Sequence, residues 1–224
     1  MSRLEIFHTA IYAASFLVLF GITEIMYYRR VHVEFTRKTA HVGTGLITLT
    51  FPLFLETHWS VLILCISFVG ILHFSNKYKV LKSINGIRRK SKGSILYPII
   101  IYMTYWIFTL FDDVLFFYLP ILILAVCDPL AAYTGRKWPR GVYTVGTDTK
   151  TMTGSTFFFI SCVLLTLFFT INLRDSWLEI ICVTLFIGLF TTIAEGLSQK
   201  GWDNLFIPLT VTVTLLISEY IFHF

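Results

Sequence analysis

Four short clusters of polar residues carry groups that could bind a phosphorylated ligand, and the first is E-F-T-R-K-T-A-H. On a helix, Glu34 and Lys38 are four residues apart and can pair. Arg37 and His41 have the same spacing, so the basic groups and the imidazole form one polar stripe that enters an apolar run. Basic residues alone would be an interfacial anchor, but a histidine one turn deeper requires a buried partner. Spacing leaves a functional stripe and an anchor as equal alternatives.

The second cluster, C-D-P-L-A-A-Y-T-G-R-K-W-P-R, places one acid before several cations. Asp128 is followed one to two helical turns later by Arg136 and Lys137, and then by Arg140. A metal–nucleotide complex needs this combination, because carboxylates bind Mg²⁺ and guanidinium and ammonium groups bind phosphate oxygens. The alternative is an ion pair at the membrane interface.

The third cluster is T-D-T-K-T-M-T-G-S, a run of hydroxyls with one lysine and one glycine. A helix that begins here would direct free N–H groups and the positive end of its dipole toward an anion. Lys150, Thr151, Gly154 and Ser155 are therefore candidate phosphate-binding residues. Alternatively, Thr153 or Ser155 is a plain N-cap.

The fourth cluster is A-E-G-L-S-Q-K-G-W-D-N-L-F-I-P. Glu195 and Asp203 bracket a tight turn, where they could share a metal ion or divide the roles of base and metal ligand. The Asp203-Asn204 pair could equally be turn and cap chemistry beside Gly201.

The elements that must position these clusters are membrane helices. The 224 residues are 56% hydrophobic and 14% charged, with a mean hydropathy of +0.75, whereas a soluble domain is about one quarter charged. A soluble globular enzyme is excluded. Cysteines without C-x-x-C spacing and histidines without H-x-x-x-H spacing also give no support to a redox or zinc site. We expect an all-α, polytopic helix bundle, a single integral membrane domain over residues 1–224, with about eight spans: 6–23, 39–55, 57–76, 93–111, 114–127, 151–173, 180–194 and 204–218.

Two of the shortest runs, 114–127 and 180–194, end at acids, Asp128 and Glu195. A carboxylate that lies near the hydrocarbon is costly and is a functional candidate by default. We therefore expect both acids at the site.

The distribution of charge predicts the orientation. All Lys and Arg residues except Arg3 and Arg174 fall in the loops after the first, third, fifth and seventh runs. The positive-inside rule then places both termini outside and the four basic loops in the cytoplasm. For the run 77–92, topology and attraction to anionic lipid are the simpler explanation, and no nucleic-acid partner is expected.

Taken together, the clusters resemble the family of CTP-dependent lipid-alcohol kinases, which includes phytol kinase, dolichol kinase and the yeast-type CTP-dependent diacylglycerol kinase. The resemblance covers residues 34–208. The sequence departs from the family at two positions. Cys127 stands where phytol kinase-like members usually carry Gly, and Thr153 stands where many members carry Glu. The segment K-T-M-T-G-S is somewhat closer to the diacylglycerol kinase branch. Five segments in the family's order carry it: R-K-T-A-H (37–41), Gly93, Tyr97 and Pro98 of K-G-S-I-L-Y-P, C-D-P-L-A-A-Y-T-G-R-K (127–137), K-T-M-T-G-S (150–155), and Glu195 with D-N-x-x-x-P (203–208).

The resemblance implies transfer of the terminal phosphoryl group of CTP to the hydroxyl of a membrane lipid alcohol of the diacylglycerol, dolichol or polyprenol, or phytol class. It implies that Asp128 and Asp203 hold Mg²⁺. Glu195, or else His41, would orient or deprotonate the alcohol. The implied nucleotide- and phosphate-binding residues are Arg37, Lys38, Arg136, Lys137, Lys150, Thr151, Gly154, Ser155 and Asn204.

Two other functions stay open. A phosphatidate cytidylyltransferase also uses CTP and Mg²⁺ at a membrane face, but it releases pyrophosphate rather than CDP. A small-solute carrier is less favoured, because carriers usually hold their polar residues near the midplane on broken helices in repeated halves. The expected partners are CTP, a lipid alcohol and the bilayer, which would be the cytoplasmic membrane of a bacterium or an ER-type membrane of a eukaryote.

Overall fold

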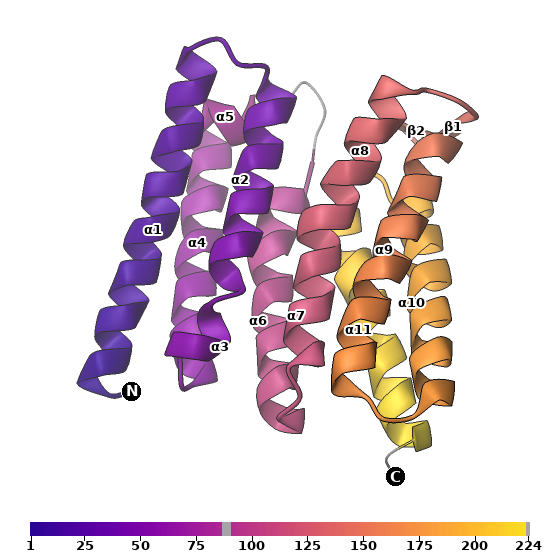
Figure 1. Cartoon of the computed structure of the whole chain (residues 1–224). Helices are drawn as coiled ribbons and strands as arrows, with labels where there is room; N and C mark the ends of the chain where they lie inside the picture. The colour runs from indigo at the N-terminus through magenta and orange to yellow at the C-terminus, as the bar shows by residue number, and fades with distance from the viewer. Residues whose placement is uncertain (87–90, 223–224) are drawn as a thin grey trace.

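The structure is a computed structural model that describes residues 1–86 and 91–222, and these are nearly all helical. Long helices run side by side along one axis, and α1 begins at the same end of the bundle at which α11 ends (Figure 1). The elements, in chain order, are α1 (Arg3–Tyr28), α2 (Val33–Thr48), α3 (Phe51–Phe54), α4 (His58–Tyr78), α5 (Lys82–Asn85), α6 (Gly93–Phe111), α7 (Leu115–Leu122), the π-helical segment η1 (Ile123–Cys127), α8 (Asp128–Lys137), β1 (Val142–Val145), β2 (Asp148–Thr151), α9 (Met152–Leu173), α10 (Trp177–Leu197) and α11 (Asp203–Phe222).

Seven helical segments within the described ranges are long and apolar enough to cross a membrane, which confirms the prediction of a polytopic helical membrane protein. They are α1, α4, α6, the continuous segment Leu115–Lys137, α9, α10 and α11. The predicted span 39–55 is divided between α2, which has 16 residues, and the short α3. Pro52 lies in the first turn of α3, where its missing N–H costs nothing. The count of eight spans and the side on which the termini lie stay predictions.

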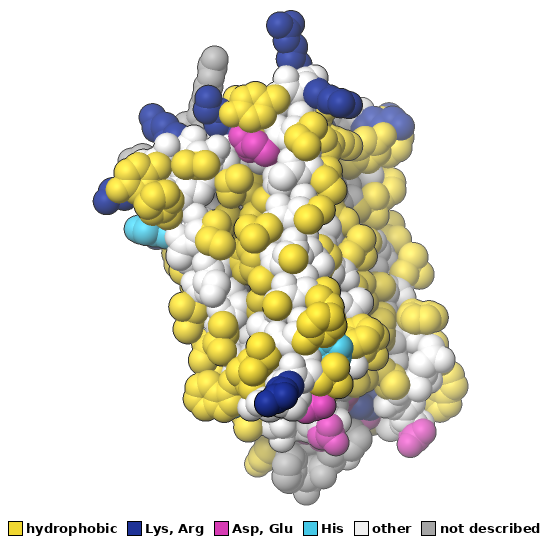
Figure 2. Space-filling view, turned by 90° about the vertical axis from the view of Figure 1, so that its left-hand side faces the viewer, with side chains coloured by type: hydrophobic (Ala, Val, Ile, Leu, Met, Phe, Trp, Pro, Cys, Tyr) yellow, Lys and Arg dark blue, Asp and Glu magenta, His cyan; other side chains and the backbone are white. Residues whose placement is uncertain are grey.

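The surface of the bundle has the pattern of a membrane protein. Figure 2 shows hydrophobic side chains along most of one face, with Lys and Arg gathered at one end and mainly acidic side chains at the other. We call the end at which β1 and β2 lie the hairpin end, and the opposite end the termini end. The basic loops of the sequence lie at the hairpin end (Figure 1). Arg88, Arg89 and Lys90, which belong to the basic run 77–92, lie outside the described residues.

The helix that carries Asp128 is the centre of the bundle. In the segment Leu115–Lys137, 67% of the most apolar window is buried, against 22–39% in the other six candidate spans. A helix that is apolar on all sides is typical of a buried core position or of a membrane span, and this one is also surrounded by other helices. The expected end of this span at Asp128 is wrong, because the helix passes through η1 and continues to Lys137. π-Helical turns of this kind often accompany functional sites.

A two-stranded hairpin, β1 and β2, adds a feature that the all-α prediction missed. Val145 pairs with Asp148, so the connection has two residues, Gly146 and Thr147. Gly146 has a φ of +57°, at the position where type II′ hairpin turns favour glycine. The hairpin places Lys150 and Thr151 directly before α9.

Ion pairs hold the termini end together. The Arg174 guanidinium, between α9 and α10, pairs with Asp113 and, at 2.9 Å, with Glu179 of α10. Glu219 of α11 is 3.7 Å away. Burial lowers the pKa of Arg174, but the hydrogen bond to Asp113 and the attraction of the three acids outweigh burial and raise it above its ordinary value. Arg174 therefore stays charged and links three helix ends.

Candidate functional site

A cavity of about 1640 Å³ lies at the hairpin end and extends into the bundle. Its charged part, which we call the polar head, is lined by Lys38, His41, Asp128, Lys150, Glu195 and Asp203. These residues come from α2, α8, β2, α10 and α11. Its other part, which we call the apolar arm, is lined by Phe16, Phe20, Phe51, Leu64, Phe68 and Leu72 of α1, α3 and α4. All four predicted clusters thus contribute residues to one space, although they are far apart in sequence.

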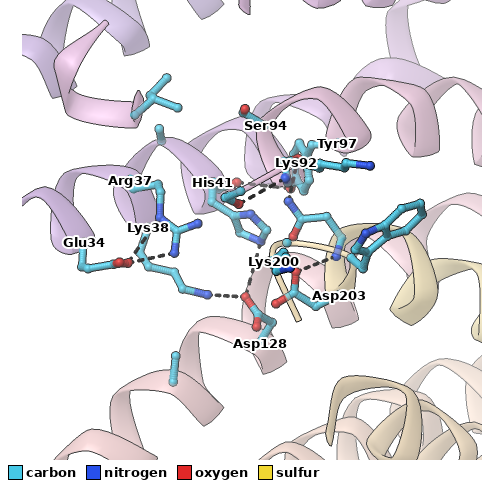
Figure 3. Close-up of a pocket in the computed structure, with 18 of the residues that line it drawn as sticks. Glu34, Arg37, Lys38, His41, Lys92, Ser94, Tyr97, Asp128, Lys200 and Asp203 are labelled. Carbon is cyan, nitrogen blue, oxygen red and sulfur yellow. Dashed lines mark hydrogen bonds and ion pairs between the residues drawn. The ribbon is translucent and has the colours of Figure 1, made fainter. Parts of the chain in front are cut away.

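Asp128 of the second cluster contacts two residues of the first cluster. Lys38 donates a hydrogen bond to Asp128 Oδ2, and His41 Nε2 lies 4.0 Å from the same oxygen (Figure 3). The Asp128 side chain is 7% exposed and the Lys38 side chain 19%, so the pair is largely shielded from solvent. An ammonium group is thus held beside a buried carboxylate, which compensates part of the cost of burying both.

The local structure of η1 explains the position of His41. In the i→i+5 pattern of a π-helix, the carbonyl of Leu124 would pair with the amide of residue 129, and Pro129 has no N–H. His41 Nε2 donates a hydrogen bond of 2.9 Å to this carbonyl instead. The ring also contacts Tyr97, whose centroid is 4.6 Å away and whose hydroxyl donates to the His41 carbonyl at 3.2 Å. The imidazole is therefore held from two sides.

Lys150 and Glu195 form the second ion pair of the polar head. Lys150 Nζ donates to Glu195 Oε1 at 2.6 Å and also to the Glu195 main-chain carbonyl. Their side chains are 14% and 9% exposed. Glu195 Oε2 is buried and has no hydrogen-bond partner among the described residues. An unpaired carboxylate oxygen at the edge of a cavity is free to accept a proton or a hydrogen bond from a ligand.

Asp203 lies at the start of α11, where its Oδ1 accepts a hydrogen bond from the Asn204 amide at 2.9 Å. Its carboxylate is close enough to Asp128 to be repelled by that acid, and it is attracted by the ammonium groups of Lys38 and Lys150. Figure 3 shows Asp203 and Asp128 at the same cavity. Three acids and two lysines thus share the polar head.

No group of three or more His, Cys, Asp and Glu residues within 1–86 and 91–222 is close enough to hold a metal ion alone. This does not conflict with Mg²⁺, because Mg²⁺ keeps several water molecules and is usually bound through one or two carboxylates together with substrate phosphates. Asp128 and Asp203 are hard oxygen ligands of the right kind.

A compact set of hydrogen bonds to main-chain groups fixes the turn between α10 and α11. Asn204 Nδ2 donates to the Gly93 carbonyl at 2.8 Å, and the Lys92 amide donates to the Lys200 carbonyl at the same distance. Asp148 Oδ2 accepts the Lys200 amide at 2.8 Å, which joins the hairpin to the turn. The sequence reasoning missed Asp148, which is buried and lines the cavity; its place in a hydroxyl-rich run gave no periodic signal.

The remaining residues of the third and fourth clusters line the cavity or support it. Thr151, Gly154, Ser155 and Asn204 all line it. The N-cap of α9 is Thr151, whose Oγ accepts the Gly154 amide at 3.0 Å, rather than Thr153 or Ser155. The Ser155 hydroxyl is hydrogen-bonded to that of Tyr143 on β1 at 2.9 Å.

The predicted cations are divided between the cavity and the surface. Arg37 lines the cavity but pairs with Glu34 at 2.8 Å, three residues earlier. Glu34 and Lys38 were expected to pair, but the lysine reaches Asp128 instead, because α2 packs against η1. Arg136 is exposed at the rim. Lys137 lies over the rings of Tyr133 and Trp138, 5.7 and 4.8 Å from their centroids, and does not line the cavity; nor does Arg140.

These features define a helical membrane protein with a charged site that continues into an apolar cavity. The chain is 27% identical to the phytol kinase of Synechocystis sp. over 176 residues, which cover 79% of this chain and 76% of the relative. This similarity supports membership of the lipid-alcohol kinase family, of the phytol kinase type, and confirms the resemblance predicted from the motifs. No protein-family model and no solved structure matches the chain.

Proposed function

We propose that the protein is a CTP-dependent kinase that transfers a phosphoryl group to the hydroxyl of a membrane lipid alcohol at the cytoplasmic face. Its relationship to a phytol kinase supports the kinase class and a lipid alcohol as acceptor. The use of CTP, the requirement for Mg²⁺ and the cytoplasmic face are inferred from the motif resemblance and the charge pattern.

The continuity of the polar head with the apolar arm is the observation that carries this proposal. One cavity offers two ion pairs, a third acid and a wall of buried apolar side chains. A nucleotide needs the charged part, and a lipid alcohol needs both, since its hydroxyl is polar and its tail is not. A solute carrier would not require a cavity at one end of the bundle that is divided into a charged part and an apolar part.

The proposed roles follow from the geometry of the polar head. Phosphoryl transfer is accelerated mainly by positioning the reactants and by neutralising charge. Lys38, Lys150 and Arg37 would neutralise the phosphates, with Arg136 at the rim. Glu195 is the candidate to orient or deprotonate the acceptor hydroxyl through Oε2, while its Oε1 is held by Lys150.

The residues present fit a magnesium ion. Asp128 and Asp203 would hold it, and the ion would neutralise the charge of the nucleotide phosphates. The Nε2–H of His41 donates to the Leu124 carbonyl, which ties α2 to η1 and leaves Nδ1 as the ring nitrogen that could accept a proton. We therefore assign to His41 the positioning of η1 and α8, and with them of Asp128.

The decisive experiment is an assay of the purified protein in detergent with radiolabelled CTP or ATP. The acceptor panel comprises diacylglycerol, phytol, farnesol and a polyprenol, and phosphatidate is added to test the cytidylyltransferase alternative. A phosphorylated lipid formed with one equivalent of CDP supports the proposal. Pyrophosphate as the stoichiometric product, with phosphatidate as acceptor, would assign a cytidylyltransferase instead. Formation of phosphorylated lipid from ATP alone would keep the kinase and remove CTP.

A control separates the activity of this protein from that of contaminating kinases. Asp128→Asn protein, purified in parallel, gives the background of contaminating kinases. If neither protein forms any nucleotide-dependent product across the panel, the kinase proposal fails and the carrier hypothesis returns.

A further inference from the structure

We infer that the apolar arm binds the hydrocarbon tail of the acceptor and that Phe51 closes its far end, so that the arm selects acceptors by tail length. This inference rests on the proposed function for the identity of the acceptor. It adds a specificity-determining residue in the part of the cavity that is lined by apolar side chains.

The packing of α2 creates the arm. α2 packs mainly against α1, α5 and η1, while α4 packs against α6. A glycine permits the contact with η1: a side chain at Gly45 would collide with Ala125 of η1 and the Tyr97 hydroxyl. Because α2 is drawn toward η1, space is left between it and α4, and this space is the arm.

The walls of the arm belong to the interior of the protein. The six residues that define it are 1–7% exposed, although they come from helices whose other faces carry the lipid-exposed side chains. On α4, for example, Leu64 and Phe68 line the arm while Ile63 and Ile66 are about half exposed or more. A tail in the arm would therefore be surrounded by protein rather than by the bilayer.

Phe51 marks the end of the arm because the backbone is fixed there. It begins α3, directly after the break that ends α2, and is 1% exposed. The rings of Tyr12 and Tyr105 pack on it with centroid distances of 4.8 and 6.5 Å. The Tyr12 hydroxyl donates to the Thr50 carbonyl at 3.0 Å, which holds the ring in place.

The depth of the arm matches one leaflet. From His41, beside the polar head, α2 continues for seven residues to its end at Thr48, which is roughly 10 Å at 1.5 Å per helical residue, and three further residues lead to Phe51. The hydrocarbon core of a bilayer is about 30 Å thick, so the arm reaches about to its centre. The arm therefore accommodates a hydrocarbon tail about as long as one leaflet is thick, if the hydroxyl of the acceptor lies at the polar head. A longer tail would collide with Phe51.

Two substitutions test the inference in opposite directions. Phe51→Leu replaces the ring that closes the far end of the arm with a smaller side chain and so lengthens the arm. Cys65→Phe places a larger side chain in the arm, at a cavity-lining position beside Leu64. The readout is the ratio of kcat/KM for geranylgeraniol to that for farnesol. We expect Phe51→Leu to raise this ratio and Cys65→Phe to lower it, each by about tenfold, which is typical of a difference of a few carbons in an apolar pocket. The control is Leu53→Ala, on the same short helix but 68% exposed, which should leave the ratio unchanged.

A second measurement does not depend on catalysis. Hexadecanol with a terminal diazirine is photolysed with the wild-type protein in detergent without nucleotide, and the modified peptides are identified by mass spectrometry. Labelling of the wall residues Phe16, Phe51 or Phe68, which excess unlabelled hexadecanol removes, supports the arm even if no kinase activity is found. Labelling confined to exposed positions such as Leu53 and Ile66 overturns the inference. An unchanged chain-length ratio in both variants of an active enzyme also overturns it.

Discussion

His41 and Leu124, 83 residues apart, are joined by a hydrogen bond from the imidazole Nε2 to a main-chain carbonyl oxygen. The carbonyl is free because Pro129 supplies no N–H to the π-helical pattern. The bond ties α2 to the helix that carries Asp128. A histidine of the first cluster thus has a structural partner that is visible only in three dimensions.

The first prediction separates a positioning His41 from a catalytic base. His41→Leu removes the donor and leaves a buried carbonyl without a partner, which costs about 1–3 kcal/mol. We expect a lower melting temperature in detergent and strongly reduced turnover. His41→Gln keeps a donor. We expect the decrease in its melting temperature to be less than half of that in the Leu variant, and we expect a measurable turnover. If His41 is the base, the Gln variant will be as inactive as the Leu variant even though it keeps most of the thermal stability.

The second prediction concerns Asp128. Asp128→Asn keeps the size of the side chain but removes its charge beside Lys38, so turnover should fall about 100-fold or more, as with the loss of other preorganised electrostatic groups. Expression and purification should be normal. Asp112→Asn is the matched control, because Asp112 is exposed at the termini end and its φ of 51° suits asparagine. Near-normal turnover of the Asp128 variant at saturating Mg²⁺ would show that Asp128 is not required for catalysis and that the Lys38–Asp128 contact is a structural ion pair.

The third prediction assigns a step to Glu195. Its Oε2 has no partner among the described residues, whereas Oε1 is bound by Lys150. Glu195→Gln keeps an oxygen acceptor for Lys150 but cannot take a proton, so kcat should fall about 10²–10⁴-fold. The KM for the nucleotide should stay close to that of the wild type. A rise in nucleotide KM with unchanged kcat would show instead that Glu195 serves nucleotide binding.

The fourth prediction concerns the metal ion. Removal of divalent cations with EDTA should abolish activity, and Mg²⁺ should restore it. Asp203→Asn removes one carboxylate that faces the same space as Asp128 and should raise the Mg²⁺ concentration for half-maximal activity by about tenfold or more. Activity in EDTA, or an unchanged Mg²⁺ dependence of the Asp203 variant, would contradict this assignment.

Residue types located the site, but their pairings were not predictable. Clusters around Lys38, Asp128, Lys150 and Glu195 stood out because charge next to apolar runs is costly. Local spacing predicted Glu34 as the partner of Lys38, yet the lysine pairs with an acid 90 residues away. Such pairs depend on how helices pack, and helical periodicity carries no information on that.

Backbone irregularities were the other limit. The fourth run predicted from hydropathy, 93–111, has the same limits as α6, because charged residues, Lys92 and Asp112, flank it on both sides. It could not detect η1, since a π turn changes hydrogen bonding without changing polarity. The hairpin was missed for a similar reason: four-residue strands with partly polar sequences give too short a pattern.

The last prediction tests the close approach of α8 and α9, which brings the second and third clusters together. A Cβ atom at Gly154 would lie 2.9 Å from the Ala131 carbonyl oxygen and 3.5 Å from Gly135 Cα, and main-chain atoms cannot move aside cheaply. Gly154→Ala should therefore force the helices apart and cost about 1–3 kcal/mol, lowering the melting temperature by about 2–12 °C. Gly21→Ala, on α1, has no atom within 4 Å of the new methyl group and should be neutral or slightly stabilising. Both variants are measured by thermal unfolding in detergent. If Gly154→Ala abolishes activity at an unchanged melting temperature, Gly154 instead contacts the phosphates and has no part in helix spacing.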